Sequence, residues 1–113
     1  MEFQRSDRVG DLLLETLAEL LAREIRDPRV QSINLTGVKV SKDLRHAKVF
    51  FNVFGDGVKK SEALTGLQRA TGFIRSKLGK QLDLRFVPAL EFAYDETEAD
   101  AQRIETLLKS VRS

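Results

Sequence analysis

Basic side chains gather around a single glycine in one internal stretch of the sequence. Residues 58–88 hold 7 basic and 2 acidic side chains, although the formal net charge of the whole 113-residue chain is only +2. Lys and Arg side chains bind phosphates and release counterions from a polyanion, and a glycine lets a phosphate approach the backbone. We therefore predict a polyanion-binding site, with a solvated basic helix face as the alternative. Its predicted residues are Arg69, Ala70, Thr71, Gly72, Arg75, Lys77 and Lys80.

The sequence offers little for catalysis or metal binding. One histidine and no cysteine exclude thiolate metal sites, cysteine nucleophiles and any site with two imidazoles. Ser41, Asp43 and His46 have the residue types of a catalytic triad, but all three lie within one short expected turn. Side chains so close in sequence cannot easily form the convergent hydrogen-bonded chain that a triad needs. We therefore expect no enzyme activity, no cofactor and no metal site.

Hydrophobic periodicity predicts how the chain positions these residues. Apolar residues at helical spacing alternate along the sequence with stretches of period two, which are rich in β-branched and aromatic residues. The pattern favours a single α+β domain over residues 1–113. In order, the predicted elements are a helix over residues 7–26 that Ser6 or Asp7 caps and Asp27-Pro28 ends, an antiparallel hairpin of strands over 33–40 and 46–54, a helix from Ser61 to Leu78, a strand over 89–94, and a helix from Thr97 to Val111.

Two glycines are expected to distort these elements. The apolar phase changes between residues 33–35 and 38–40, which predicts a bulge at Thr36-Gly37. A glycine inside a helix costs roughly 1 kcal/mol relative to alanine, so we predict that a kink at Gly72 divides its helix into two. The second helix would then begin near Gly72, where free backbone amides favour a bound phosphate.

Aromatic residues on the strand over 46–54 provide a different hypothesis. Val49, Phe51 and Val53 alternate with Phe50 and Phe54, and we assign the first three to the core. The other two could stack nucleobases, lie beneath a loop or helix, or dock on another protein. In the last case the chain is a protein-interaction module, using these aromatics or its acidic C-terminal helix, and its RNA affinity is incidental.

The remaining composition bears on location and assembly. The first residues lack the basic and apolar pattern of a signal peptide, and no apolar run is long enough to span a bilayer. No heptad pattern or long apolar patch calls for a dimer. We therefore expect a soluble cytoplasmic monomer that has no membrane partner.

The predicted helix, kink and helix between strands resemble the KH domain, in the form whose extra helix and strand precede the core. This implies a type II order, α-β-β-α-kink-α-β, with a three-stranded mixed sheet and a C-terminal helix. KH domains clamp a nucleic-acid backbone with a GxxG loop. Here that loop is absent, and Ala70-Thr71-Gly72 is similar to the variant of the bacterial ribosome-binding factor A family.

Other short stretches agree with that family in order and spacing, over nearly the whole chain. They are Arg5 with Arg8-Val9, Arg23-Glu24-Ile25-Arg26-Asp27-Pro28-Arg29, Ser41-Lys42-Asp43-Leu44, Ala47-Lys48-Val49, Gly72-Phe73-Ile74-Arg75, Leu78-Gly79, Leu84-Arg85 and Pro88-Ala89-Leu90-Glu91-Phe92.

The resemblance implies a non-enzymatic assembly factor for the small ribosomal subunit. Such a factor binds the immature subunit, contacts its ribosomal RNA near the decoding region and promotes late maturation of that RNA, notably in the cold; other assembly factors are further candidate partners. The RNA contact would centre on the residues around Gly72. Basic residues elsewhere that could extend it are Arg5, Arg8, Lys39, Lys42, Arg45 and Lys48.

Overall fold

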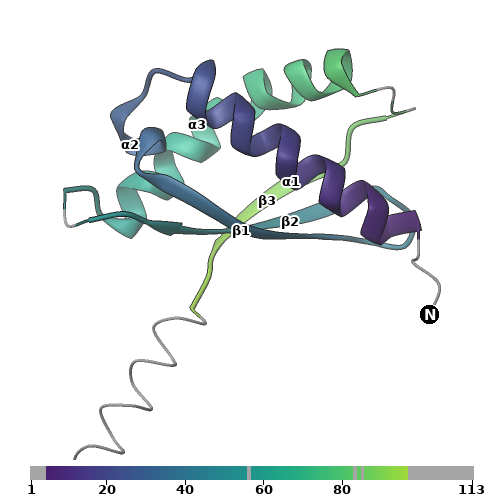
Figure 1. Ribbon diagram of the computed structural model, residues 1–113, viewed down its shortest axis with the longest axis horizontal. Coiled ribbons are helices and arrows are strands. Elements are labelled where there is room, and N and C mark those ends of the chain that lie inside the picture. The colour runs from purple at the N-terminus through teal and green to yellow at the C-terminus, as the bar shows by residue number, and fades with distance from the viewer. Residues whose placement is uncertain (1–4, 56, 83, 85, 97–113) are drawn as a thin grey trace, which may run out of the picture.

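The computed structural model describes residues 5–55, 57–82, 84 and 86–96 (Figure 1). Along these residues the elements are α1 (Arg5–Arg23), α2 (Pro28–Gln31), β1 (Ile33–Val40), β2 (His46–Val53), α3 (Lys60–Gln81) and β3 (Ala89–Tyr94). The predicted helix from Thr97 to Val111 lies outside the described residues.

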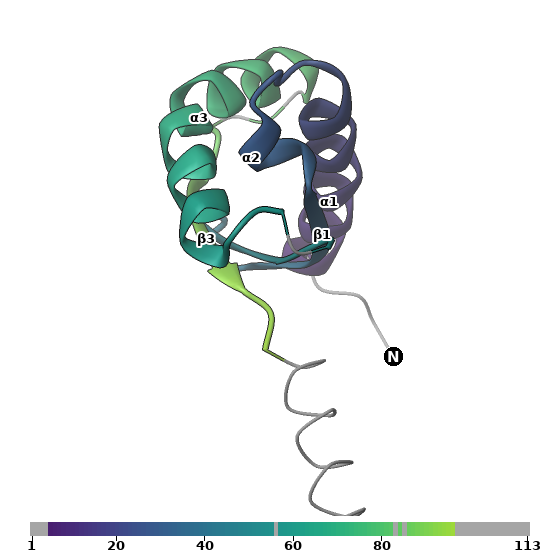
Figure 2. The ribbon, with the colours of Figure 1, turned by 90° about the vertical axis from the view of Figure 1, so that its left-hand side faces the viewer.

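The three strands form one mixed sheet with β2 in the centre. β1 pairs with β2 in antiparallel orientation, and β3 pairs with β2 in parallel orientation. Parallel strands need a long crossover connection, and α3 lies in that connection. Helices α1 and α3 lie over the same face of the sheet, with α2 between them at one end (Figure 1, Figure 2). The predicted α+β class, hairpin and three-stranded mixed sheet are confirmed.

The predicted bulge in β1 is also confirmed. The register with β2 shifts between Leu35, which pairs with Phe51, and Gly37, which pairs with Phe50. The extra residue lets the side chains before and after the bulge face the helices, although they have opposite phases in the sequence. Two apolar residues before the bulge and two after it all pack against the core: Ile33, Leu35, Val38 and Val40.

The core lies between the sheet and the two long helices. Its fully buried side chains include Leu13 and Leu17 of α1, Phe51 of β2, and Leu67 and Ile74 of α3. As predicted, Val49 and Phe51 are buried and Val53 packs against them. In α1, a β-carbon on Gly10 would lie only 3.2 Å from the Val38 carbonyl oxygen, so this glycine lets the helix approach β1 closely.

The predicted end of the first helix is wrong. α1 ends at Arg23, and Asp27-Pro28 begins α2 instead of ending α1. Proline restricts the residue before it to extended backbone, and Asp27 accordingly has φ −87° and ψ 120°. This is the conformation of an N-cap residue, and proline suits the first position of a helix. At the other end, Ser6 and Asp7 lie within α1 and do not cap it.

The predicted division of the long helix at Gly72 is also wrong. Residues 60–81 form one uninterrupted helix, which begins after Lys59. The ribbon of α3 bends as it passes over the sheet (Figure 2). The Thr71 hydroxyl donates a hydrogen bond to the Leu67 carbonyl at 2.9 Å, a contact that often accompanies helix bending. The glycine therefore lies inside one continuous helix.

Candidate nucleic-acid interface

Arg69, Gly72 and Lys80 are exposed on α3, and we call them the α3 surface. The buried residues Ile74 and Leu78 turn toward the sheet, and the helical period of 3.6 residues places the three on the other side. Apart from its two chain neighbours and the backbone of its own helix, no heavy atom lies within 4 Å of the position that a β-carbon on Gly72 would occupy. A partner can therefore approach the backbone there closely, because no side chain beyond those of the two chain neighbours covers it.

The continuity of α3 changes the chemistry expected at Gly72. Amides inside an α-helix donate to carbonyl oxygens four residues earlier, so they are not free to bind a phosphate as amides at a helix start are. Of the two residues before the glycine, Ala70 is half-buried and packs against the core, and the Thr71 hydroxyl bonds within the helix. Phosphate contacts on this surface must therefore come from the side chains of Arg69 and Lys80.

The Arg75 side chain is not part of the α3 surface, because it contacts the segment before β3. Its Nη2 donates to the carbonyl of Val87 at 3.0 Å, and its Nε donates to the carbonyl of Pro88 at 3.3 Å. These carbonyls hold the guanidinium in place but leave its charge uncompensated. Within the described residues, no carboxylate lies within ion-pair distance of Arg75.

Lys77 points to the other side, toward α1. Its Nζ lies 3.7 Å from Glu24 Oε2 and 5.5 Å from the centre of the Phe73 ring. The Glu24 carboxylate offsets its charge. The prediction grouped Lys77 with Arg69, Arg75 and Lys80, but the structure directs it to a different neighbour.

Arg69 lies near α2, where a compact ion pair forms. Asp27 caps α2 by accepting a hydrogen bond from the Arg29 amide at 3.0 Å, and its carboxylate also lies 2.7 Å from Arg29 Nη2. These hydrogen bonds lower the pKa of the Asp27 carboxyl, and the nearby charge of Arg69 lowers it further. The pair packs beside Gly66 of α3, where a β-carbon would lie 3.1 Å from Val30 Cγ2.

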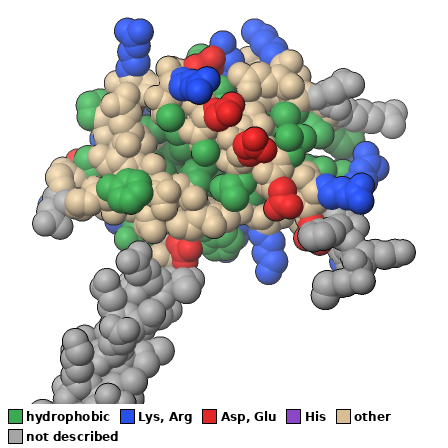
Figure 3. Space-filling model, viewed as in Figure 1, with side chains coloured by type: hydrophobic (Ala, Val, Ile, Leu, Met, Phe, Trp, Pro, Cys, Tyr) green, Lys and Arg blue, Asp and Glu red, His purple; other side chains and the backbone are tan. Residues whose placement is uncertain are grey.

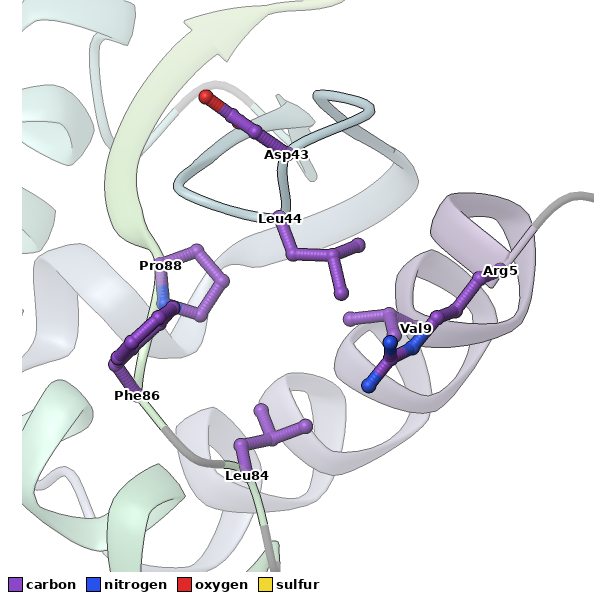
Figure 4. Close-up of a pocket in the computed structure, with 7 residues that line it drawn as sticks. All are labelled: Arg5, Val9, Asp43, Leu44, Leu84, Phe86 and Pro88. Atoms are coloured by element: carbon purple, nitrogen blue, oxygen red, sulfur yellow. The ribbon is translucent and has the colours of Figure 1, made fainter.

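A second basic region surrounds Phe86, whose residue surface is 56% exposed. On one side lies a cavity of about 250 Å³, which we call the Phe86 cavity (Figure 4). On the other side Phe86 shares a shallower hollow with Arg45, Arg75, Val87 and Ala89. The cavity is lined by Arg5, Val9, Asp43, Leu44, Leu84, Phe86 and Pro88.

The structure therefore brings three predicted cations together around a residue that the sequence analysis missed. Arg5, Arg45 and Arg75 come from α1, the β1–β2 turn and α3. One signal in the sequence pointed to Phe86. It is an aromatic residue in the short segment between a helix and a strand, outside the periodic apolar positions of both elements. Arg8 and Lys42 are exposed but line neither the cavity nor the hollow.

Lys39 and Lys48 do not belong with either group. They are directly paired across β1 and β2, and both are exposed. Their neighbours in sequence, Val40 and Val49, pack into the core, so the two lysines lie on the opposite face of the sheet. They cannot share a face with the α3 surface.

The turn that carries Arg45 is held by its own polar side chains. Ser41 Oγ donates to Asp43 Oδ1 at 2.6 Å, which together with the Arg45 amide lowers the pKa of the Asp43 carboxyl. The His46 amide donates to Ser41 Oγ at 3.1 Å. Because the backbone of His46 makes this contact, Ser41 and Asp43 act as turn residues, as the sequence indicated.

The aromatics of the alternative hypothesis differ in accessibility. Phe54, just after β2, is 64% exposed. Phe50 is half-buried, and Lys48 Nζ lies 5.6 Å from the centre of its ring.

Two further features bear on function. In the part of the chain that the structure describes, no three His, Asp or Glu side chains are grouped as metal ligands. Across the same residues, no helix combines the length and apolar character needed to cross a bilayer.

Figure 3 shows one face of the molecule, where acidic side chains and apolar side chains lie among scattered basic ones. Basic side chains are prominent mainly along the upper rim and at one end in this view.

Comparison with known proteins places the chain in a family. A sequence model of the family described as ribosome-binding factor A matches residues 5–108. Ribosome-binding factor A of Syntrophus aciditrophicus is 49% identical over 110 residues, covering 97% of this chain and 89% of that protein. The protein of the same name from Thioalkalivibrio sulfidiphilus is 47% identical over 107 residues, covering 95% of this chain and 83% of that protein.

Known structures of this family match the fold of the chain. The crystal structure of ribosome-binding factor A from Thermus thermophilus matches with a TM-score of 0.71 and 27% identity, covering 79% of this chain and 93% of that one. A homology model of the Thermus thermophilus protein, fitted into the cryo-EM map of its 30S complex, matches with a TM-score of 0.57 and 29% identity, covering 74% and 92%. These structures have the predicted KH-like fold. The chain belongs to the ribosome-binding factor A family.

Proposed function

We propose that this protein binds the immature small ribosomal subunit and contacts its ribosomal RNA to promote late maturation of that RNA, without catalysing a reaction. Its family supports this proposal, as does the relative from Thermus thermophilus that has been fitted into a 30S complex. The observation that carries the RNA contact is the α3 surface. There, Gly72 leaves the helix backbone uncovered beside Arg69 and Lys80.

The two cations bind phosphates, and the glycine removes the side chain that would otherwise hold the RNA backbone away from the helix. This contact reads the shape of folded RNA, because phosphates carry no sequence information. Arg75 and Lys77, whose charge the Glu24 carboxylate offsets, flank the surface. Arg5, Arg8, Lys42 and Arg45 extend the contact beyond α3. The protein acts in the cytoplasm as a monomer, and other assembly factors are further partners.

Co-sedimentation over a salt series tests this function. The protein is mixed with purified immature small subunits, mature small subunits and, as the control, large subunits. We expect preferential binding to immature small subunits that weakens as salt rises, because phosphate contacts release counterions. Equal binding to large and small subunits would contradict the proposal.

The exposed Phe54 favours a second candidate, a protein-interaction module that docks on another assembly protein. Its binding to assembly intermediates would resist salt and would be lost in Phe54→Ala. The salt series therefore separates the two candidates.

A further inference from the structure

The Phe86 cavity has apolar walls that come from three separate parts of the chain. Val9 lies on α1, Leu44 in the β1–β2 turn, and Pro88 just before β3. In Figure 4 these side chains and Leu84 converge on the cavity, with Phe86 beside Pro88. At about 250 Å³, the cavity is below the 300–1,000 Å³ range typical of sites for drug-sized ligands. It therefore has room for one small group rather than a drug-sized ligand.

The turn is built so that Leu44 faces this cavity. Leu44 has a φ of 62°, a left-handed conformation that non-glycine residues rarely adopt. The Leu44 amide donates to the Ser41 carbonyl at 2.9 Å, and the Arg45 amide after it donates to Asp43 Oδ1 at 3.1 Å. These bonds hold the turn, and Figure 4 shows the Leu44 side chain extending into the space between α1 and Pro88.

Three arginines lie around the apolar walls. The Arg5 side chain reaches over the cavity in Figure 4. Arg45 and Arg75 line the hollow on the other side of Phe86. Within the described ranges, none of these three arginines has a carboxylate within ion-pair distance.

Asp43, the one acidic residue among those lining the cavity, does not oppose an anion there. Its carboxylate accepts hydrogen bonds from Ser41 Oγ and the Arg45 amide. In Figure 4 its oxygen points away from the cavity. The site therefore combines an apolar cavity for a flat ring, an exposed aromatic face at its edge and cations on both sides.

We propose that the Phe86 cavity binds one unpaired nucleotide of a single-stranded RNA segment. The base enters the cavity and stacks on Phe86, and the phosphates on either side contact Arg5 and the Arg45–Arg75 pair. Aromatic rings stack on bases of any sequence, whereas bases in a duplex already stack on one another and cannot enter a cavity. This inference rests on the proposed function, but adds to it a second site that reads a flexible RNA segment.

Fluorescence titration with short RNA probes tests the site. The probes are a hexauridine, a hexaadenosine and a duplex of matched length, each with a fluorescent label at one end. The variants are Phe86→Leu, which removes the ring but keeps an apolar side chain, Phe86→Tyr, which restores a ring, and Arg5→Gln. Stacking on an aromatic residue contributes about 1–3 kcal/mol per base, which corresponds to roughly 5- to 150-fold in affinity.

We expect Phe86→Leu to weaken single-strand binding within that range and to leave its salt dependence unchanged. Phe86→Tyr should bind as the unmodified protein does. Arg5→Gln should lower the salt dependence of binding. Duplex binding should not respond to Phe86→Leu. Single-strand binding that is unchanged in Phe86→Leu, or duplex binding that falls equally, would overturn the proposal. Either result can occur while the unmodified protein still co-sediments with small subunits, so failure of this site is distinguishable from failure of the proposed function.

Discussion

Arg75 of α3 is hydrogen-bonded to Val87, which follows it by 12 residues, through Nη2 and the carbonyl oxygen at 3.0 Å. Its Nε donates to the next carbonyl, that of Pro88, at 3.3 Å. One side chain thus fastens the long helix to the segment that enters β3. Phe86 lies in this segment and lines the same hollow as Arg75 and Arg45.

This contact predicts a loss of stability when the guanidinium is removed. Arg75→Ala should lower the free energy of unfolding by about 1 kcal/mol, since each such hydrogen bond contributes a modest net amount. Arg75→Lys should lose similar stability, because a lysine lacks the fork that spans two carbonyls, yet it should keep more RNA affinity because it keeps the charge. Urea denaturation measures the first effect, and an Arg75→Ala protein as stable as the unmodified one would show that the contact is dispensable.

Two glycines of α3 predict opposite responses to alanine. At Gly72 the added methyl group meets nothing within 4 Å, so Gly72→Ala should stabilise the helix by up to about 1 kcal/mol. At Gly66 the methyl group would lie 3.1 Å from Val30 Cγ2 and 3.2 Å from Arg29 Cβ. The resulting displacement of α2 should offset the gain in helix propensity. Thermal denaturation should therefore rank Gly72→Ala above Gly66→Ala, and the reverse order would contradict this packing.

The same Gly72→Ala variant should bind RNA less well although it is more stable. A methyl group on the α3 surface holds the RNA backbone away from Arg69 and Lys80. Affinity for immature small subunits, measured by co-sedimentation, should fall while the melting temperature rises. Because the variant is better folded, a weaker affinity cannot be attributed to unfolding. An unchanged affinity would remove Gly72 from the interface.

Two carboxylates predict how stability depends on pH. Hydrogen bonds from Arg29 hold the pKa of Asp27 below its ordinary value of 3.8, and the Ser41 hydroxyl does the same for Asp43. A lowered pKa means that the folded state favours the charged form, so this stability is complete above about pH 5 and is lost as the pH falls below 3.8 through the lowered values. Asp27→Asn and Asp43→Asn should each be destabilising at pH 7, measured by urea denaturation.

The difference between each of these variants and the unmodified protein should shrink at pH 3. Asparagine also caps helices and turns well, so each substitution removes mainly the charge. A difference that stays constant between pH 7 and pH 3 would show that the charge of that carboxylate does not contribute.

The sequence predicted the fold well where hydrophobic periodicity and turn residues agree. The bulge at Thr36-Gly37 follows from a change of apolar phase, and the structure has it there. Asp27-Pro28 was predicted to end the first helix, but such a pair can also begin a helix, as it does here. The Asp27 cap and the buried Val30 hold the short second helix in place.

The candidate site was less predictable, because helix periodicity gives the face of a residue but not its neighbours. Lys77 and Arg75 are two residues apart, yet Lys77 meets Glu24, just after the end of α1, and Arg75 meets carbonyls before β3. At Gly72 propensity favoured a break, whereas tertiary packing on both sides keeps one bent helix. Phe86 was missed because its role depends on a cavity formed by α1 and the β1–β2 turn, which are distant in sequence.

The salt dependence of binding for two matched double variants tests the central claim most directly. Arg69→Ala with Lys80→Ala removes two charges from the α3 surface, and Lys39→Ala with Lys48→Ala removes two from the opposite face of the sheet. Affinity for immature small subunits is measured at several salt concentrations. We predict that the first pair weakens binding and lowers the slope of log affinity against log salt by roughly 1 to 2, while the second pair changes neither. Equal slopes for the two double variants would contradict an RNA contact through α3.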